Sequence, residues 1–271
     1  MTTGTGGNGL VVRALYRASL RAIKSLGDRS LPMQWPIRAH DWGKHRRLDT
    51  KELEKARESM FPWSIGYPLN EIGELEQETL LKIVRERFRD TTRDDYELAL
   101  DEGFRALQNF HSLAAQLQVS SVCETKGIYV QAMSRFLGIN SATNAYIFAY
   151  RIRVSNVGGI DTVQLRSRHW IIQDTNGGSV VIPRGSPGVV GQTPTLAPGE
   201  IFEYVSGSEL NAPTGTIQGS FNLFIEGDDD LSQKGEEQTT NSFEANINPF
   251  QLRADHIHAL NRISDISGEE R

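Results

Sequence analysis

The chain has 271 residues, of which 38% are hydrophobic and 23% charged, a composition typical of a globular protein with room for two domains. Its formal net charge of −5 excludes bulk electrostatic attraction to nucleic acid. Cys123, the only cysteine, excludes an intrachain disulfide and a metal cage built from cysteines. No apolar run approaches the roughly 20 residues that a membrane span needs.

Residues 1–9 form a small polar tail, which we expect to be flexible and not a secretory signal. The stretch from Leu10 to Leu26 places Leu15, Ala18 and Ala22 at helical spacing. Basic residues follow a second face of this helix, namely Arg13, Arg17, Arg21 and Lys24. A basic amphipathic helix is typical of a mitochondrial address signal and also of the solvated face of an ordinary helix, so both interpretations stay open.

A long segment, residues 31–70, connects this helix to the next and holds four prolines that interrupt regular structure. Within it, Asp49 and Glu52 resemble a capping box for a short helix that ends near Met60. An indole has a large apolar surface to bury. We therefore expect the tryptophans of this segment to pack onto the helices; they are Trp35, Trp42 and Trp63.

Two further helices are predicted, one from about Ile72 to Arg89 and one from about Thr92 to Leu117. The buried stripe of the first is Leu80, Leu81, Val84 and Phe88. The stripe of the second is Tyr96, Leu100, Phe104, Leu107, Phe110 or His111, Ala114 and Leu117. Three amphipathic helices make a minimal bundle.

After Val119 the hydrophobic period drops to two, as in Tyr146–Val154 and Thr162–Leu165. Turn signals such as Asn176-Gly177-Gly178 separate short strands, a spacing that indicates a β-sandwich. Four more strands are expected, at 169–174, 201–206, 216–225 and 243–252. We expect the acidic run 226–238 to be an exposed hairpin insertion and residues 256–271 to be a polar tail.

The elements of this half resemble the ApaG family in order and spacing, over about 130 residues. They include Tyr146-x-Phe-Ala-Tyr150, Ser167-Arg-His-Trp170, Gly188-Val-Val-Gly-Gln192, Leu196-Ala-Pro-Gly-Glu200 and Tyr204-x-Ser-Gly207. The resemblance implies that residues 121–255 form an immunoglobulin- or fibronectin-III-like sandwich of two antiparallel sheets. Known domains of this family are associated with binding, including recognition by F-box adaptors and by a DNA-polymerase-interacting protein, which implies an interaction module.

A glycine-rich run, Gly185-Ser-Pro-Gly188-Val-Val-Gly191, follows Arg184. A dinucleotide fingerprint needs a strand, a turn and a helix, and an all-β domain has no such helix. Backbone amides in a loop can still form an anion nest. An anion-binding loop built from Arg184, Gly185, Gly188 and Gly191 and a plain inter-strand loop therefore both stay open.

The sequence predicts neither a catalytic residue nor a metal site. On a strand, the neighbours of His169 on its own face are Ser167 and Ile171, and they supply no nucleophile or paired carboxylate. His256 and His258 are two residues apart, so they do not share a helix face.

In the first half, Ala14-Leu15-Tyr16-Arg17 resembles the motif that names the LYR family of small helical mitochondrial proteins. Ile83–Arg89 and Leu100-Asp-Glu-Gly103 resemble the second and third helices of that family. We therefore expect residues 10–118 to be an LYR-like three-helix bundle with an unusually long insertion at about 30–70. The whole chain is then an α+β multidomain protein.

LYR proteins commonly bind acylated mitochondrial acyl carrier protein, whose 4′-phosphopantetheine-linked acyl chain enters between the three helices. The resemblance implies this partner, a mitochondrial matrix location with the cytoplasm as the alternative, and no cofactor other than that acyl chain. Guanidinium groups suit an acidic, phosphate-bearing partner. The expected partner-binding residues are Tyr16, Arg17, Arg21, Lys24, Arg85, Phe88 and Arg89.

The resemblances together lead us to expect a non-catalytic adaptor or assembly factor that docks on acyl carrier protein and holds a client protein. Two alternatives stay open. One is a sensor that binds a nucleotide or phosphate through the loop Gly185–Gly191. The other is a substrate-recognition module for protein turnover, which needs an F-box-like segment that we do not find in the first 118 residues.

Overall fold

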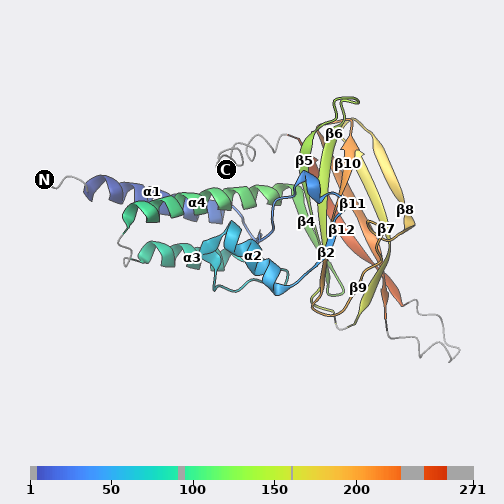
Figure 1. Cartoon of the computed structure of the whole chain (residues 1–271), viewed down its shortest axis with the longest axis horizontal. Helices are drawn as coiled ribbons and strands as arrows, with labels where there is room; N and C mark the ends of the chain where they lie inside the picture. Colours follow the sequence, from blue (N-terminus) through green and yellow to red (C-terminus); the bar gives the residue numbers. More distant parts are fainter. Residues whose placement is uncertain (1–4, 91–94, 160, 227–240, 255–271) are drawn as a thin grey trace. The chain divides into compact units, whose positions relative to one another are not determined.

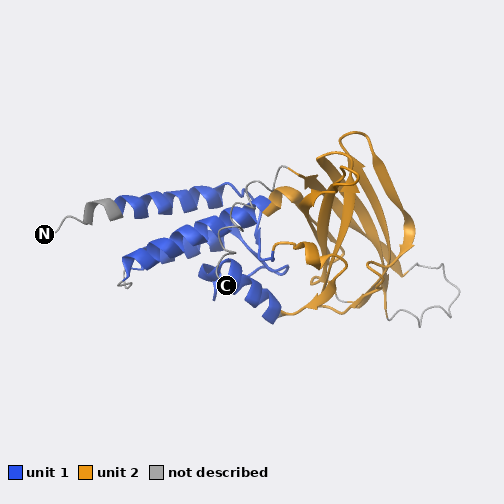
Figure 2. Cartoon of the chain, turned by 45° about the horizontal axis from the view of Figure 1, so that its top comes forward, with its two compact units in different colours: residues 1–35, 50–115 blue, residues 36–49, 116–271 orange. Residues whose placement is uncertain are grey.

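The computed structural model describes residues 5–90, 95–159, 161–226 and 241–254. The chain divides into two compact units, which Figure 2 shows in different colours. The helical unit comprises residues 1–35 and 50–115, and the β-unit comprises residues 36–49 and 116–271. Each unit is built from segments that are separate in the sequence, because the connecting segment is shared between them.

The helices of the helical unit are labelled in Figure 1. They are α1 (Thr5–Lys24), α2 (Thr50–Met60), α3 (Gln77–Arg89) and α4 (Tyr96–Gln116). A 3₁₀ turn, η2 (Pro62–Ser64), follows α2. Two short strands, β1 (Leu31–Pro32) and β3 (Glu74–Leu75), pair antiparallel. The bounds of α2 agree with a helix that starts directly after Asp49.

Helices α1 and α3 lie antiparallel. Tyr16 in the middle of α1 contacts Phe88 at the end of α3, with ring centroids 5.2 Å apart. At the opposite end of the pair, the Gln77 side chain donates to the carbonyls of Ile23 (3.3 Å) and Gly27 (3.1 Å). These side-chain amide bonds tie the start of α3 to the end of α1 and the turn that follows it.

Helix α4 buries a stripe that shares Phe110 with the predicted one but otherwise differs from it. Gly103, Ala106, Phe110 and Leu113 are buried, whereas Phe104 is 47% exposed. The apolar residues of this helix cover more than one face, so periodicity alone does not determine which face turns inward. Gly103 settles it, because its missing side chain lets Leu15 approach: a Cβ there would lie 2.6 Å from Leu15 Cδ2.

The β-unit contains two antiparallel sheets. The first has the order β2-β10-β6-β5-β4, and the second has the order β12-β11-β7-β8 with β9 paired to β7. Their bounds are β2 (His45–Leu48), β4 (Ser120–Thr125), β5 (Ile128–Ile139), β6 (Tyr146–Asn156), β7 (Val163–Asp174), β8 (Ser179–Pro187), β9 (Thr195–Leu196), β10 (Ile201–Leu210), β11 (Thr214–Ile225) and β12 (Ser242–Arg253). Short 3₁₀ turns lie at Ala39–Asp41 and Leu117–Val119.

The core of this unit lies between the two sheets, since strands of both contribute to one buried cluster. Trp170 of β7 is its largest side chain and is 1% exposed. Its ring contacts Tyr150 of β6 (5.8 Å), Phe221 of β11 (5.8 Å) and Phe250 of β12 (6.5 Å). The alternation of apolar residues along these strands therefore buries one face of each sheet, as a β-sandwich requires.

The connecting segment differs from its prediction. Residues 36–49 belong to the β-unit and not to the helical domain expected over 10–118, because β2 pairs with β10 and extends the sheet by one strand. Trp42 accordingly packs on Gly207 of β10, where a Cβ would overlap the indole. The expectation that Trp42 packs onto the helices was wrong, while Trp63 is buried among helical residues.

The chain ends also differ from the prediction. Helix α1 begins at Thr5, inside the expected tail 1–9, and Arg13 Nε donates to the Gly9 carbonyl (3.0 Å) within this glycine-rich turn. The acidic hairpin expected over 226–238 falls outside the described residues from 227 onward. The polar tail expected over 256–271 lies outside them entirely.

Candidate ligand pocket in the helical unit

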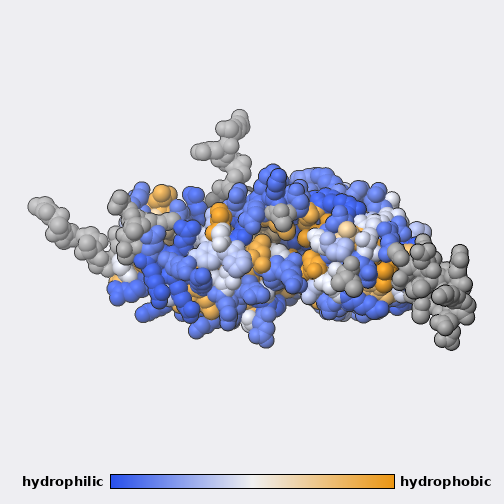
Figure 3. Space-filling view, turned by 90° about the horizontal axis from the view of Figure 1, so that it is seen from below, coloured by the Kyte–Doolittle hydropathy of each residue, from blue (hydrophilic) through white to orange (hydrophobic). Residues whose placement is uncertain are grey.

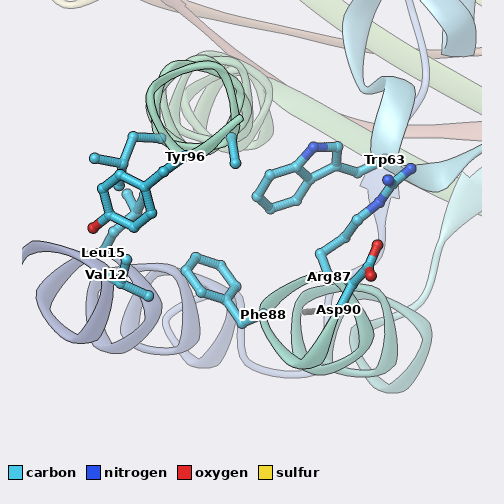
Figure 4. A pocket seen from close by; sticks show the side chains of 9 residues that line it. Val12, Leu15, Trp63, Arg87, Phe88, Asp90 and Tyr96 are labelled. Atoms are coloured by element: carbon cyan, nitrogen blue, oxygen red, sulfur yellow. The ribbon is translucent and has the colours of Figure 1, made fainter. Parts of the chain in front are cut away.

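An apolar pocket of about 230 Å³ lies between helices α1, α3 and α4. Figure 4 shows the three helices surrounding it and the rings of Phe88, Tyr96 and Trp63 along its walls. Its lining residues are Val12, Leu15, Trp63, Arg87, Phe88, Asp90, Tyr96, Ala99 and Leu100. Concave, mostly apolar sites with a few polar groups are the usual form of small-molecule sites.

Helical periodicity explains how each helix contributes to the pocket. Val12 and Leu15 are three residues apart on α1, so they share a face. On α4, Tyr96, Ala99 and Leu100 have the same relationship. Because Ala99 has no side chain beyond Cβ, it leaves free the volume that a leucine there would fill.

Trp63 reaches the pocket from the connecting segment and is held in place by Arg57. The Arg57 guanidinium is 3% exposed and donates to Ser64 Oγ (3.1 Å) and Glu54 Oε1 (3.0 Å). It also bonds the carbonyls of Ser64 and Tyr67 on either side of the turn that follows Trp63. A planar guanidinium with several fixed donors suits such a role, and it fixes the position of η2 and therefore of the indole.

The predicted partner-binding residues fall into two groups. Tyr16 and Phe88 are partly buried and contact each other, and Phe88 also lines the pocket. The five basic residues are exposed on two neighbouring helices: Arg17, Arg21 and Lys24 on α1, and Arg85 and Arg89 on α3. Spacings of three and four residues place each set on one helix face, so α1 and α3, two of the helices that line the pocket, each carry a basic face.

The glycine loop of the β-unit is occupied by its own chain. Its amides donate to carbonyls, from Gly188 to Arg166 (2.9 Å), from Val189 to Gln192 and from Gln192 to Val189 (both 2.8 Å). Val189 is 1% exposed and belongs to the sandwich core. Arg184 does not reach over the loop, because its Nη1 pairs with Glu244 Oε2 (3.0 Å). Gly185, Gly188 and Gly191 all have positive φ, which accounts for glycine at these turns.

A buried ionic row crosses the first sheet on the face opposite its core. Glu203 of β10 lies directly across from Arg46 of β2 and Arg153 of β6. Its carboxylate accepts from Arg46 Nη2 (2.8 Å) and Arg153 Nη2 (2.9 Å), and Arg151 Nε lies 3.4 Å away. Burial raises the pKa of Glu203, but the guanidiniums of Arg153, Arg151 and Arg46 outweigh it and lower the pKa to about 2.

The remaining titratable residues show no catalytic or metal arrangement within the part of the chain that the structure describes. His169 Nδ1 lies 2.8 Å from the Ile182 carbonyl, a contact within the sheet. No group of three or more His, Cys, Asp or Glu side chains is placed to hold a metal ion among the described residues. His256 and His258 lie outside them. Of the described helices, none combines the length and apolarity needed to cross a membrane.

The face of the molecule in Figure 3 gives no stronger candidate. On the face that Figure 3 shows, hydrophilic residues cover most of each unit, and apolar residues appear in small groups. Scattered exposed apolar side chains of this kind are normal for a folded protein. The apolar pocket of the helical unit therefore remains the site with the clearest ligand-binding geometry.

Sequence reasoning missed Trp63 and Ala99 as pocket residues. Leu15, Tyr96 and Leu100 appeared in the expected buried stripes, but none of them was assigned to a pocket. The signal that was present is the cluster of tryptophans in a segment too long for a simple connection, since a large apolar side chain in such a segment must be buried somewhere.

The β-unit has recognisable relatives. Residues 139–224 match the family described as the ApaG domain. Protein ApaG of Methylobacterium sp. (strain 4-46) is 41% identical over 139 residues, which span 51% of this chain and 95% of that protein. Protein ApaG of Aromatoleum aromaticum is 44% identical over 108 residues, which span 39% of this chain and 83% of that protein. The crystal structure of the putative ApaA protein from Bordetella pertussis is 36% identical and covers 46% of this chain and 92% of its own, with a TM-score of 0.39.

Proposed function

Since the chain belongs to the ApaG family through its β-unit, we propose that it is a non-catalytic adaptor in which a helical unit receives an acyl carrier protein and the β-unit holds a client protein. The observation that carries the proposal is the apolar pocket between α1, α3 and α4, two of which also carry exposed basic faces, α1 and α3. A carrier protein with an acidic surface and a hydrocarbon chain on its prosthetic group has the matching chemistry.

The electrostatic part of the proposal rests on five exposed cations. An acidic partner surface can reach these side chains while the helices stay folded, because all five are exposed: Arg17, Arg21, Lys24, Arg85 and Arg89. Exposed charge complementarity contributes mostly to the association rate and to specificity, and it weakens with salt. We therefore propose that the basic faces steer the partner and the pocket holds its acyl chain.

The apolar part rests on the pocket walls. A hydrocarbon chain gains about 0.8 kcal/mol for each methylene that leaves water, so even a short chain adds appreciable affinity. Phe88 connects the two parts, because it lines the pocket and contacts Tyr16 of the α1 motif. The resemblance of Leu15-Tyr16-Arg17 to the LYR motif supports the same partner, and with it a location in the mitochondrial matrix.

The filled interior of the β-unit supports a client-binding role on its surface. Its core is filled by large side chains, and the amides at Gly188, Val189 and Gln192 already have partners, so binding to a protein surface is the role that we assign to it. Its relatives carry the name ApaG and no enzymatic name.

The experiment is a capture of acyl carrier protein by the tagged full-length chain, followed by mass spectrometry. We expect wild type to recover acylated carrier protein, and a double variant with Arg17→Ala and Arg85→Glu to bind it about tenfold more weakly at low salt. Arg105→Glu is the matched control, because this arginine is exposed on α4 of the same unit but not on α1 or α3.

A second variant addresses the pocket. Ala99→Leu fills space between the helices and should weaken capture of the acylated carrier protein without changing any charge. Equal recovery by wild type, the double arginine variant and Ala99→Leu would contradict the proposed interface. Recovery of no carrier protein by the folded wild-type chain would contradict the proposed function itself.

A further inference from the structure

One side chain, Trp63, forms the inner end of the pocket. Beyond it the helical unit contains a second cavity of only about 10 Å³, and Trp63 lines both spaces. The other residues around the second cavity are Ser19, Ile23, Phe61, Val84, Ala106, Leu107 and Phe110. A space of this size is at the lower limit for a single water molecule, so the interior beyond Trp63 is effectively closed.

Helix α4 presents little bulk along the line that joins the two cavities. Ala99 lines the pocket, Gly103 follows one turn later, and Ala106 lines the second cavity. A Cβ on Gly103 would lie 3.8 Å from Trp63 Cη2, which places the indole against the glycine. The tryptophan ring, and not the helix behind it, is therefore what separates the two spaces.

The ring is fixed and does not hang from a free loop. Trp63 is 8% exposed and meets Phe88 edge-on, with centroids 6.0 Å apart, while Phe61 packs at 6.4 Å. The turn that carries it is held by the buried Arg57, as described above. Figure 4 shows the indole at the edge of the pocket, on the side opposite Val12 and Leu15.

We propose that Trp63 sets the length of the hydrocarbon chain that the helical unit accepts, so that the pocket takes short straight-chain acyl groups and rejects long ones. The pocket volume of about 230 Å³ fits a short chain, because it lies below the roughly 300–1,000 Å³ of pockets for drug-sized ligands. This inference rests on the proposed function of the pocket and adds its specificity.

The test uses the purified full-length chain and saturated straight-chain fatty acids of increasing length, with binding measured by isothermal titration calorimetry. In the wild type we expect affinity to rise about fourfold with each added methylene and then to stop rising at a short limiting length. In Trp63→Ala the limit should move to longer chains, because removal of the indole frees its volume and extends the pocket towards the second cavity. Each methylene beyond the old limit should then again add about fourfold.

Two controls keep the result interpretable. Trp63→Phe retains an aromatic ring between Phe61 and Phe88 and should move the limit by a smaller number of methylenes, which gives a result even when the alanine variant does not fold. Trp42→Ala removes an indole from the β-unit and should leave the limit unchanged. Circular dichroism establishes that each variant is folded before it is titrated.

The failures of the two proposals are distinguishable. If chains bind the wild type and the folded Trp63 variants keep the same limiting length, the role of Trp63 is overturned and the pocket remains a chain-binding site. If no chain of any length binds the wild type, and Ala99→Leu does not weaken capture of the acylated carrier protein, the proposed function of the pocket fails. The length limit then fails with it.

Discussion

The two units differ in how completely their interiors are filled. In the β-unit, Trp170 is surrounded by Tyr150, Phe221 and Phe250, and the core between the sheets is closed by Val189. In the helical unit, Trp63 also sits among aromatic rings, but one side of it faces a pocket of about 230 Å³. The same residue type is a core centre in one unit and a cavity wall in the other.

This difference teaches where each unit can bind a ligand. A filled sandwich offers its surface, so its partners meet strands and loops from outside. A bundle with an unfilled end offers a site between its helices, and here Trp63 of η2 forms one wall of that site. Protein interiors are normally packed as densely as organic crystals, so an unfilled apolar space costs stability and calls for a functional reason.

The largest expected effect is on the free energy of unfolding, when each of the two tryptophans is replaced by alanine. Trp170→Ala should destabilise the β-unit by about 3–5 kcal/mol, since it empties a fully packed site. Trp63→Ala should cost less, about 2 kcal/mol, because one side of the ring already faces a cavity. Urea denaturation of both variants measures the free energies of unfolding, and a larger loss for Trp63→Ala would reverse the comparison.

The next effect concerns the buried ionic row, which has no counterpart in the pocket. The pKa of Glu203 is about 2 in the folded chain and 4.5 ordinarily, so its ionised form stabilises the fold above pH 4.5. That contribution, about 3 kcal/mol, is lost as the pH falls towards 2. Glu203→Gln should remove it at neutral pH and flatten the dependence of stability on pH in this window.

Glu200→Gln is the matched control for this charge. Glu200 also pairs with an arginine, Arg47 (2.6 Å), but its side chain is 43% exposed, and exposed pairs contribute at most about 1 kcal/mol. The contributions of Glu203 and Glu200 are separated by measuring the free energy of unfolding of both variants and the wild type at several pH values from about 7 to 2. A wild-type pH profile that Glu203→Gln leaves unchanged would show that the row does not stabilise the β-unit.

The smallest effect is expected at the glycine loop. Arg184 is two-thirds exposed and its pair with Glu244 lies on the surface, so Arg184→Ala should change the unfolding free energy by less than about 0.5 kcal/mol. Calorimetry with inorganic phosphate should detect no heat for wild type or variant. Heat that Arg184→Ala abolishes would restore the loop as an anion site and place a ligand site in both units.

Strands in which apolar and polar residues alternate clearly were predictable from the sequence. Strands that form only by pairing with a distant strand were not. Tyr146–Val154 falls within β6, and the expected strands at 162–165 and 169–174 merge into the single strand β7. The sequence of β8 contains Pro183 and Pro187, which argue against a strand, but both are tolerated because β8 lies at a sheet edge. Strand β2 has no pattern of its own and forms only because it pairs with β10, about 150 residues away.

The pocket was half predictable. Helical spacing identified Leu15, Phe88 and Leu100 as inward-facing, and the expected space between three helices is present. Its inner limit depends on Trp63, which reaches the bundle through a network centred on Arg57. No local pattern shows where a side chain from an irregular segment will pack, because that position is set by tertiary contacts.

The most direct test of the account is the affinity of the full-length chain for acyl carrier protein with and without an acyl group on its prosthetic arm. The basic faces meet both forms, but only the acylated form has a chain for the pocket. We predict that the acylated form binds at least tenfold more tightly, and that Ala99→Leu removes most of this difference. Equal affinity for the two forms would contradict the central claim that the helical pocket binds the chain.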